Sequence, residues 1–225
     1  MKQKFLSSLM AALVARATLG MSTVLVPAVA LAAPTDVAAE ASPQEAIAAV
    51  SKRLFEALDS NRAAIRRNPD AVNALVAEIL LPRFDVDYAA QLVLARHWNE
   101  ATQEQRAHFI RAFYGALLHT YGAALADATA DRLKVLPFRG DASAAQVIVR
   151  TEVTRSTGAV VPVDYRLRRT ADGWKAFDVV IEGISYVRNY RTDLDSEISA
   201  RGLDATIKRI ETQGLVSGGE RTASR

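Results

Sequence analysis

The stretch AQVIVRTEVTRSTGAVVPVDYRLRRTADGWKAFDVVIEGISYV, residues 145–187, decides the fold class of this chain. Its side chains alternate between apolar and polar, so Val147 and Val149 fall on one face of an extended strand and Ile148 and Arg150 on the other. Antiparallel strands with one buried and one solvated face have this pattern. The stretch therefore predicts an antiparallel sheet.

Turn-forming residues divide the stretch into a meander of strands. Glycine-containing pairs interrupt the apolar runs at intervals that suit hairpins. We expect strands over residues 132–138, 145–155, 160–169 and 173–187, separated by Gly140-Asp141, Thr157-Gly158 and Asp172-Gly173.

Upstream of the sheet, apolar residues recur every three or four positions, as in amphipathic helices. Two of the expected helix starts are capping boxes, in which Ser or Thr and Glu or Gln satisfy free backbone donors reciprocally. The starts are Ser42 to Glu45, Asn68-Pro69-Asp70, Asp85 with a helix to about His97, and Thr102 to Gln105 with a helix to about Asp127. Two further helices are expected after the sheet, over residues 190–201 and 204–213.

Helices followed by a sheet indicate an α+β domain. We expect N-terminal helices packed on a curled, mainly antiparallel four-stranded sheet, with the apolar face of the sheet toward the helices. This single domain spans residues 42–213. The small and polar residues 214–225 are expected to form a disordered tail.

The first 32 residues are typical of a secretory signal peptide. Lys2 and Lys4 precede an apolar run, and Ala30-Leu31-Ala32 fits a cleavage site. Arg16 interrupts the apolar run, so an uncleaved membrane anchor is the alternative. We expect cleavage and a soluble, exported protein.

The charge of the chain argues against a nucleic-acid partner. The chain has 28 basic and 25 acidic residues, a formal charge of +3. The bases of the signal peptide account for this excess, so the mature protein is neutral. A neutral chain without an aromatic stacking platform is not expected to bind nucleic acid. Because no heptad pattern calls for association, we expect a monomer.

The sequence contains none of the common catalytic, nucleotide-binding or metal-binding motifs. It has no cysteine, which excludes disulfides, thiolate metal sites and a catalytic thiol. His97, His108 and His119 are expected to be partly exposed helix residues rather than metal ligands. We therefore expect no metal, no cofactor and no enzymatic activity.

Two polar residues near the end of the meander have a catalytic and a structural interpretation. Ser185 and Asp178 would form a hydrolase triad if His97 lay beside them. The favoured interpretation of Asp178 is a buried carboxylate that bonds to a turn or a helix end.

The run Tyr186, Arg188, Tyr190 and Arg191 also has two interpretations. The guanidinium groups would suit an anionic headgroup. A solvated helix start whose tyrosines pack inward is favoured, because Asp193 follows closely and dilutes the charge.

Several motifs in order resemble the MlaC family, the periplasmic phospholipid-binding component of a bacterial system that maintains outer-membrane lipid asymmetry, also called the toluene-tolerance family. The resemblance spans about residues 42–213. Its most specific part is Gly173-Trp174-Lys175 followed by Asp178 through Ser185 and Asn189-Tyr190-Arg191. It is also carried by Asn68-Pro69 through Leu80-Leu81-Pro82, Phe84 to Asp87, Trp98, Thr102 to Arg106 with Phe109, and Val163 to Leu167. Ala95-Arg96 replaces an expected Gly-Lys-like pair, Tyr186 an aliphatic residue, and Leu194 an expected Phe.

The resemblance implies a soluble periplasmic shuttle for glycerophospholipids, with the acyl chains enclosed between helices and sheet. It implies two docking partners, an outer-membrane lipoprotein–porin complex and an inner-membrane ABC transporter complex. The sheet half is similar to nuclear-transport-factor-like folds, which often enclose an apolar cavity.

We expect the apolar faces of helices and strands to line this cavity. The candidate lipid-binding residues are Val76, Leu80, Leu92, Phe109, Phe113, Leu117, Val149, Val163, Tyr165 and Ile181.

Three other functions stay open. A periplasmic binding protein for another apolar ligand, such as a sterol, hopanoid or quinone, would have the same cavity. A lipid-acting hydrolase would use Ser185. An interaction protein would have a filled core.

Overall fold

The computed structural model describes residues 42–68, 71–126, 129–155 and 157–215. The expected signal peptide and residues 216–225 of the expected tail lie outside the described residues. Leu215 is buried in the helical core, so packing continues two residues past the expected domain limit at residue 213.

Helices come first along the described chain, as the sequence predicts. They are α1 (Pro43–Arg67), α2 (Ala71–Ile79), the 3-10 helix η1 (Leu81–Arg83), α3 (Val86–Leu94), α4 (Arg96–Glu100), α5 (Gln103–Ala126) and the 3-10 helix η2 (Ala130–Arg132). Both capping boxes are confirmed: Ser42 and Glu45 bond reciprocally at 3.2 and 2.7 Å, and Thr102 and Gln105 at 3.1 and 3.0 Å. Asp85 caps α3 by accepting from the Tyr88 amide.

The described residues form a five-stranded antiparallel sheet with the strands in chain order. Its strands are β1 (Leu133–Val135), β2 (Gln146–Thr154), β3 (Val160–Thr170), β4 (Gly173–Ile181) and β5 (Ile184–Ser185), followed by α6 (Tyr186–Arg201) and α7 (Leu203–Gln213). The meander is confirmed, with one strand more than expected.

The extra strand arises because the expected strand over residues 173–187 is wrong in its second half. Glu182 and Gly183 have φ values of 50° and 82°, and positive φ at both central residues makes a two-residue type I′ hairpin turn. β4 therefore ends at Ile181, and β5 returns along it. The expected helix start at residue 190 is likewise late, since α6 begins at Tyr186.

The expected helix from Asp85 to about His97 is broken at Ala95. Ala95 has φ 50° and ψ −116°, a conformation that glycine favours at the first central position of a type II′ turn. The sequence pattern did not reveal the break, because the apolar spacing continues across it.

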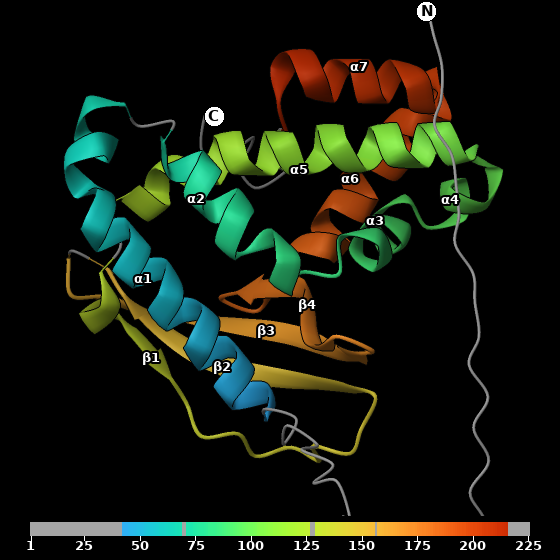
Figure 1. Ribbon diagram of the computed structural model, residues 1–225. Helices are drawn as coiled ribbons and strands as arrows, with labels where there is room; N and C mark the ends of the chain where they lie inside the picture. The colour runs from blue at the N-terminus through green and yellow to red at the C-terminus, as the bar shows by residue number, and fades with distance from the viewer. Residues whose placement is uncertain (1–41, 69–70, 127–128, 156, 216–225) are drawn as a thin grey trace, which may run out of the picture. The chain divides into compact units, whose positions relative to one another are not determined.

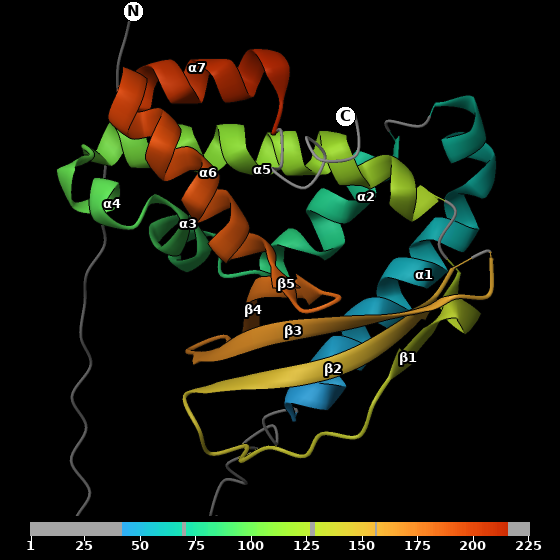
Figure 2. The ribbon, with the colours of Figure 1, turned by 180° about the vertical axis from the view of Figure 1, so that it is seen from behind.

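α1 lies on one face of the sheet and the other helices extend beyond its β4 side (Figure 1), so the α+β fold class is confirmed. α1 crosses the sheet diagonally, whereas α2, α5, α6 and α7 form a layer past β4 (Figures 1 and 2). β4 and β5 lie between β3 and this helical layer in both views.

Buried apolar residues form three separate clusters within the described chain. The α5–α6–α7 core is the largest and contains Phe109, Phe113, Tyr190, Leu194 and Ile207. The α1–sheet core contains Ile47, Val147, Val149, Leu167 and Trp174. The α1–α2 core contains Leu54, Leu58, Val72, Val76 and Ile79. A domain usually has one contiguous core, whereas here the residues packed on the sheet and those packed between the helices form separate clusters.

The turn at Ala95 generates a stability prediction. Ala95→Gly should raise the free energy of unfolding by about 1 kcal/mol, because relief of ~1–3 kcal/mol of backbone strain outweighs ~0.4–1 kcal/mol of added unfolded-state entropy. Urea unfolding measures the change. The control Ala49→Gly, on the exposed side of α1, should lower stability by about 1 kcal/mol. Equal destabilisation by both variants would contradict strain at Ala95.

Candidate functional site

The inner face of the sheet, the face that α1 crosses, consists of cross-strand rows of mainly apolar side chains. Paired residues in neighbouring strands lie on the same face, so the register defines these rows. They are Val147–Leu167–Ala176, Val149–Tyr165–Val179, Thr151–Val163–Ile181–Ile184 and Val153–Val161. The Thr151 hydroxyl is satisfied, since it donates to the Val163 carbonyl at 2.7 Å.

In the two middle rows of the inner face, burial decreases from β2 toward β4 and β5. In the third row Thr151 is 1% and Val163 8% exposed, Ile181 is half-buried, and Ile184 is 60% exposed. The first row, by contrast, is packed against Ile47 of α1. The inner face is thus buried around Ile47 of α1, whereas Tyr165, Val179, Ile181 and Ile184 keep accessible apolar surface.

Tyr165 lies in the middle of the inner face and combines a deep position with accessible surface. Burial raises the pKa of its hydroxyl, yet part of the side chain stays accessible. Within the described chain its hydroxyl has no hydrogen-bond partner. A side chain that borders an internal space has these properties.

The structure brings four of the ten predicted lipid-binding residues together. Val149, Val163, Tyr165 and Ile181 occupy adjacent positions in two rows of the inner face. Val149 is fully buried in the α1–sheet core, whereas Tyr165 and Ile181 keep accessible surface.

The six predicted residues from helices are divided among different places. Val76 and Leu80 belong to the α1–α2 core or pack against it. Phe109, Phe113 and Leu117 belong to the α5–α6–α7 core or pack against it. Leu92 is half-buried on α3.

The predicted lipid-binding set omitted half-buried apolar residues at the margins of two of the cores. Leu75 and Leu118 lie at the margin of the α1–α2 core, and Tyr114 at that of the α5–α6–α7 core. Burial, and secondarily the carboxylates of Asp85 and Asp87, raise the pKa of Tyr114. Helical periodicity identifies an apolar face but not the position on it where packing stops, so these residues carried no distinguishing signal.

Asp178 lies on the opposite, outer face of the sheet and joins it to α6. The carboxylate is 3% exposed and accepts from the Ser185 hydroxyl at 2.6 Å and the Val187 amide at 3.0 Å. The Ser185 hydroxyl in turn accepts from the Arg188 amide and caps α6. Asp178 therefore bonds to a helix end, and the structural interpretation is confirmed.

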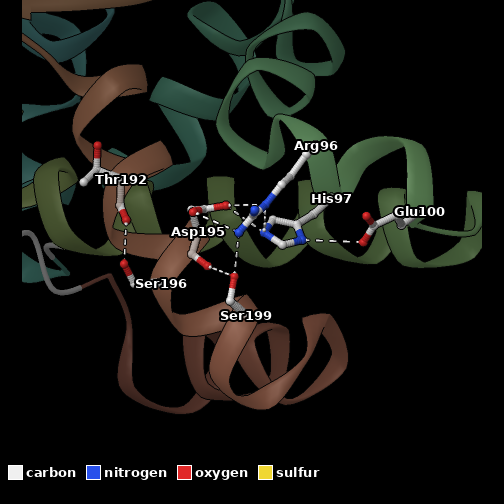
Figure 3. A network of polar contacts seen from close by, with 7 residues as sticks. All are labelled: Arg96, His97, Glu100, Thr192, Asp195, Ser196 and Ser199. Atoms are coloured by element: carbon white, nitrogen blue, oxygen red, sulfur yellow. Dashed lines mark hydrogen bonds and ion pairs between the residues drawn. The ribbon is translucent and has the colours of Figure 1, made fainter.

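The structure does not assemble Ser185, Asp178 and His97 into a triad. His97 lies on α4, and its Nε2 is 2.9 Å from Asp195 of α6 (Figure 3). Arg96 also bonds to Asp195 and to Ser199. His97 is 8% exposed, so the prediction that it is partly exposed is wrong. The break at Ala95 turns it toward α6.

The tyrosines at the start of α6 pack inward, which confirms the favoured interpretation. Tyr190 is 2% exposed, and its hydroxyl is 2.9 Å from that of Tyr121 on α5. Tyr186 packs edge-on against both rings. Arg188 and Arg191 are exposed.

A hollow of about 510 Å³ with a mixed polar and apolar lining lies along α6 and α7. Its lining includes Glu197, Arg201 and Arg209, and the Arg209 guanidinium binds Glu197 through two bonds of 3.0 and 2.6 Å. This charged lining does not suit an acyl chain, so the inner face of the sheet is the better candidate for an apolar ligand. Among the helices formed by residues 42–68, 71–126, 129–155 and 157–215, none has the length and apolar character to cross a membrane.

A sequence model of the MlaC protein family matches residues 48–212. The chain belongs to the MlaC family. Toluene tolerance protein Ttg2D of Pseudomonas putida is 29% identical over 169 residues, which cover 74% of this chain and 78% of that protein. The intermembrane phospholipid transport system binding protein MlaC of Haemophilus influenzae is 22% identical over 177 residues, 77% of this chain and 82% of that one.

A solved structure of a phospholipid-binding protein from Ralstonia solanacearum, in complex with a phospholipid, has the same fold. The TM-score is 0.71 at 27% identity, and the similarity covers 76% of this chain and 96% of that one. This agreement confirms the fold, and the match to the family model confirms the resemblance to the MlaC family.

The role of Ser185 as a cap generates a second prediction. Ser185→Ala should lower the free energy of unfolding by about 2 kcal/mol, because it removes a helix cap and a donor to a buried carboxylate. Urea unfolding measures this loss. Ser196→Ala, at an exposed position of the same helix, serves as the control and should change little.

A hydrolysis assay on phospholipid vesicles separates the capping role from a catalytic one. Wild type and Ser185→Ala should release fatty acid at the same background rate. Release by wild type that the substitution abolishes would show that Ser185 is catalytic.

Proposed function

We propose that this protein binds a glycerophospholipid and carries it through the periplasm between the outer and inner membranes. The acyl chains lie between the inner face of the sheet and helices α1, α2 and α5, and the headgroup stays in water. The observation that carries this proposal is the division of the apolar core, with half-buried side chains such as Leu80, Tyr165 and Ile181 at its margins. The phospholipid complex of the Ralstonia solanacearum relative supports it.

Hydrophobic free energy explains why such a shuttle needs an enclosed site. Each methylene moved out of water is worth about 0.8 kcal/mol, so a sixteen-carbon chain left in water costs roughly 12 kcal/mol. The inner-face rows offer Val, Ile and Tyr side chains and a Thr whose hydroxyl is already bonded. Apart from the Tyr165 hydroxyl, such a surface replaces water around a chain without leaving a polar group unpaired.

The direction of transport comes from partners in this proposal. The sequence contains no nucleotide-binding motif, so energy enters through an inner-membrane ABC transporter complex. At the outer membrane the donor or acceptor is a lipoprotein–porin complex. The name of the Haemophilus influenzae relative, an intermembrane phospholipid transport system binding protein, supports a role within such a system.

Native mass spectrometry tests the proposal directly. The mature protein, purified from periplasm without detergent, should carry discrete added masses, and organic extraction should identify them as phospholipids. Extraction of a sterol, hopanoid or quinone instead would favour a binding protein for another apolar ligand. A bare protein mass that is unchanged after mixing with phospholipid vesicles would contradict ligand binding altogether.

Filling the space over the inner face should displace the ligand. Ile181→Trp places a larger side chain on the half-buried part of the third row, and we expect the lipid-bound fraction to fall severalfold with a nearly native circular dichroism spectrum. Ile148→Trp on the outer face is the matched control and should keep its lipid. Native mass spectrometry of both variants measures the bound fraction. An equal lipid content in both folded variants would remove Ile181 from the site.

A further inference from the structure

The β4–β5 hairpin exposes a large apolar side chain, Ile184, on the inner face of the sheet. Ile184 is 60% exposed. It is the Cα partner of Ile181, so it lies on the inner face. Ile148 and Val160 are the other large apolar residues with high exposure in the described chain, and both lie on the outer face.

The geometry of the turn requires Ile184 to be on the inner face. Only Glu182 and Gly183 separate β4 from β5, and a two-residue turn pairs the residues that flank it. Ser185, one residue later, falls on the outer face, where it meets Asp178. Because the Ser185 bond also caps α6, a slip of the register that hides Ile184 would break the cap.

Ile184 continues an apolar row that begins in the interior. Thr151, Val163, Ile181 and Ile184 are neighbours across four strands, and exposure rises along the row from 1% to 60%. The hairpin is held in place from the side, since Arg155 pairs with Glu182 at 3.6 Å and the Glu182 amide donates to the Pro162 carbonyl. The exposed end of the row therefore has a defined position.

The hairpin lies where sheet and helical layer approach each other. β5 pairs with β4 and leads directly into α6, and Figure 2 shows it between β3 and the helices α2 and α6. The half-buried Tyr186 follows β5 directly and packs against Tyr121 of α5. Ile184 is thus two residues away in the chain from an aromatic side chain that packs in the helical layer.

We propose that the acyl chains enter and leave across the β4–β5 hairpin, with Ile184 as the apolar rim of the opening. This inference rests on the proposed function. An acyl chain that moves from a membrane or a partner protein into the interior stays out of contact with water only if apolar side chains line the whole path. The rim is in contact with the chain segment next to the headgroup once the lipid is bound.

Cysteine probes test contact between the rim and the lipid. The chain has no cysteine, so Ile184→Cys and the control Ile148→Cys each provide a single thiol for a bimane label. The labelled proteins are mixed with vesicles of phosphatidylcholine brominated on the acyl carbons near the headgroup, and the vesicles are removed by sedimentation. We expect lipid-loaded protein to show bromine quenching of bimane at position 184 and none at 148.

Loading kinetics test the role of the rim in transfer. Ile184→Lys should slow uptake of a fluorescent phospholipid from vesicles about tenfold, equivalent to ~1.4 kcal/mol in the barrier. The control Val160→Lys, at an outer-face residue of similar exposure, should load at the wild-type rate.

The outcomes separate this inference from the proposed function. If wild-type protein takes up no phospholipid, the proposed function fails. If wild-type protein loads but positions 184 and 148 are quenched equally, or not at all, the opening is elsewhere and the inference is overturned. If Ile184→Lys does not fold, the comparison of bimane quenching at positions 184 and 148 still tests the inference.

Discussion

The arrangement of sheet and helices depends on the buried carboxylate of Asp178. It binds the Ser185 hydroxyl and the Val187 amide, and Arg166 lies 3.7 Å away on the neighbouring strand. A buried charge is tolerated only when hydrogen bonds replace its hydration, so these donors hold the end of β4 and the start of α6 in one geometry. The same geometry turns Tyr190 into the α5–α6–α7 core and leaves Ile184 on the inner face.

The two faces of the sheet differ in character because they contact different helices. On the outer face, Arg168 pairs with Asp85 and stacks on Tyr88, which packs edge-on against Phe177. These contacts attach α3 through polar and aromatic groups. The inner face is apolar, and its packing is complete only beneath α1. The accessible part of this face is the surface that the proposed function assigns to the acyl chains.

Local sequence signals predicted correctly the features that depend on interactions between residues close together in the chain. Capping boxes at Ser42 and Thr102 predicted helix starts correctly, because they involve side chains and amides three residues apart. Alternation along β2 predicted which side chains face the helices. The hairpin at Glu182 and the break at Ala95 were missed, since neither position has the residue that its positive φ favours. The candidate site was predicted as a set of apolar faces, of which the structure joins Val149, Val163, Tyr165 and Ile181.

The sequence by itself determined the α+β order of elements, the inward face of β2 and the membership of the MlaC family, because periodicity, caps and motif order are written along the chain. Only the tertiary structure decided where packing ends. Val149 and Ile181 both belong to the inner face, yet one is fully buried and the other keeps accessible surface. The difference comes from the path of α1 across the sheet (Figure 1). Burial depends on neighbours far apart in the chain, so no local pattern specifies it.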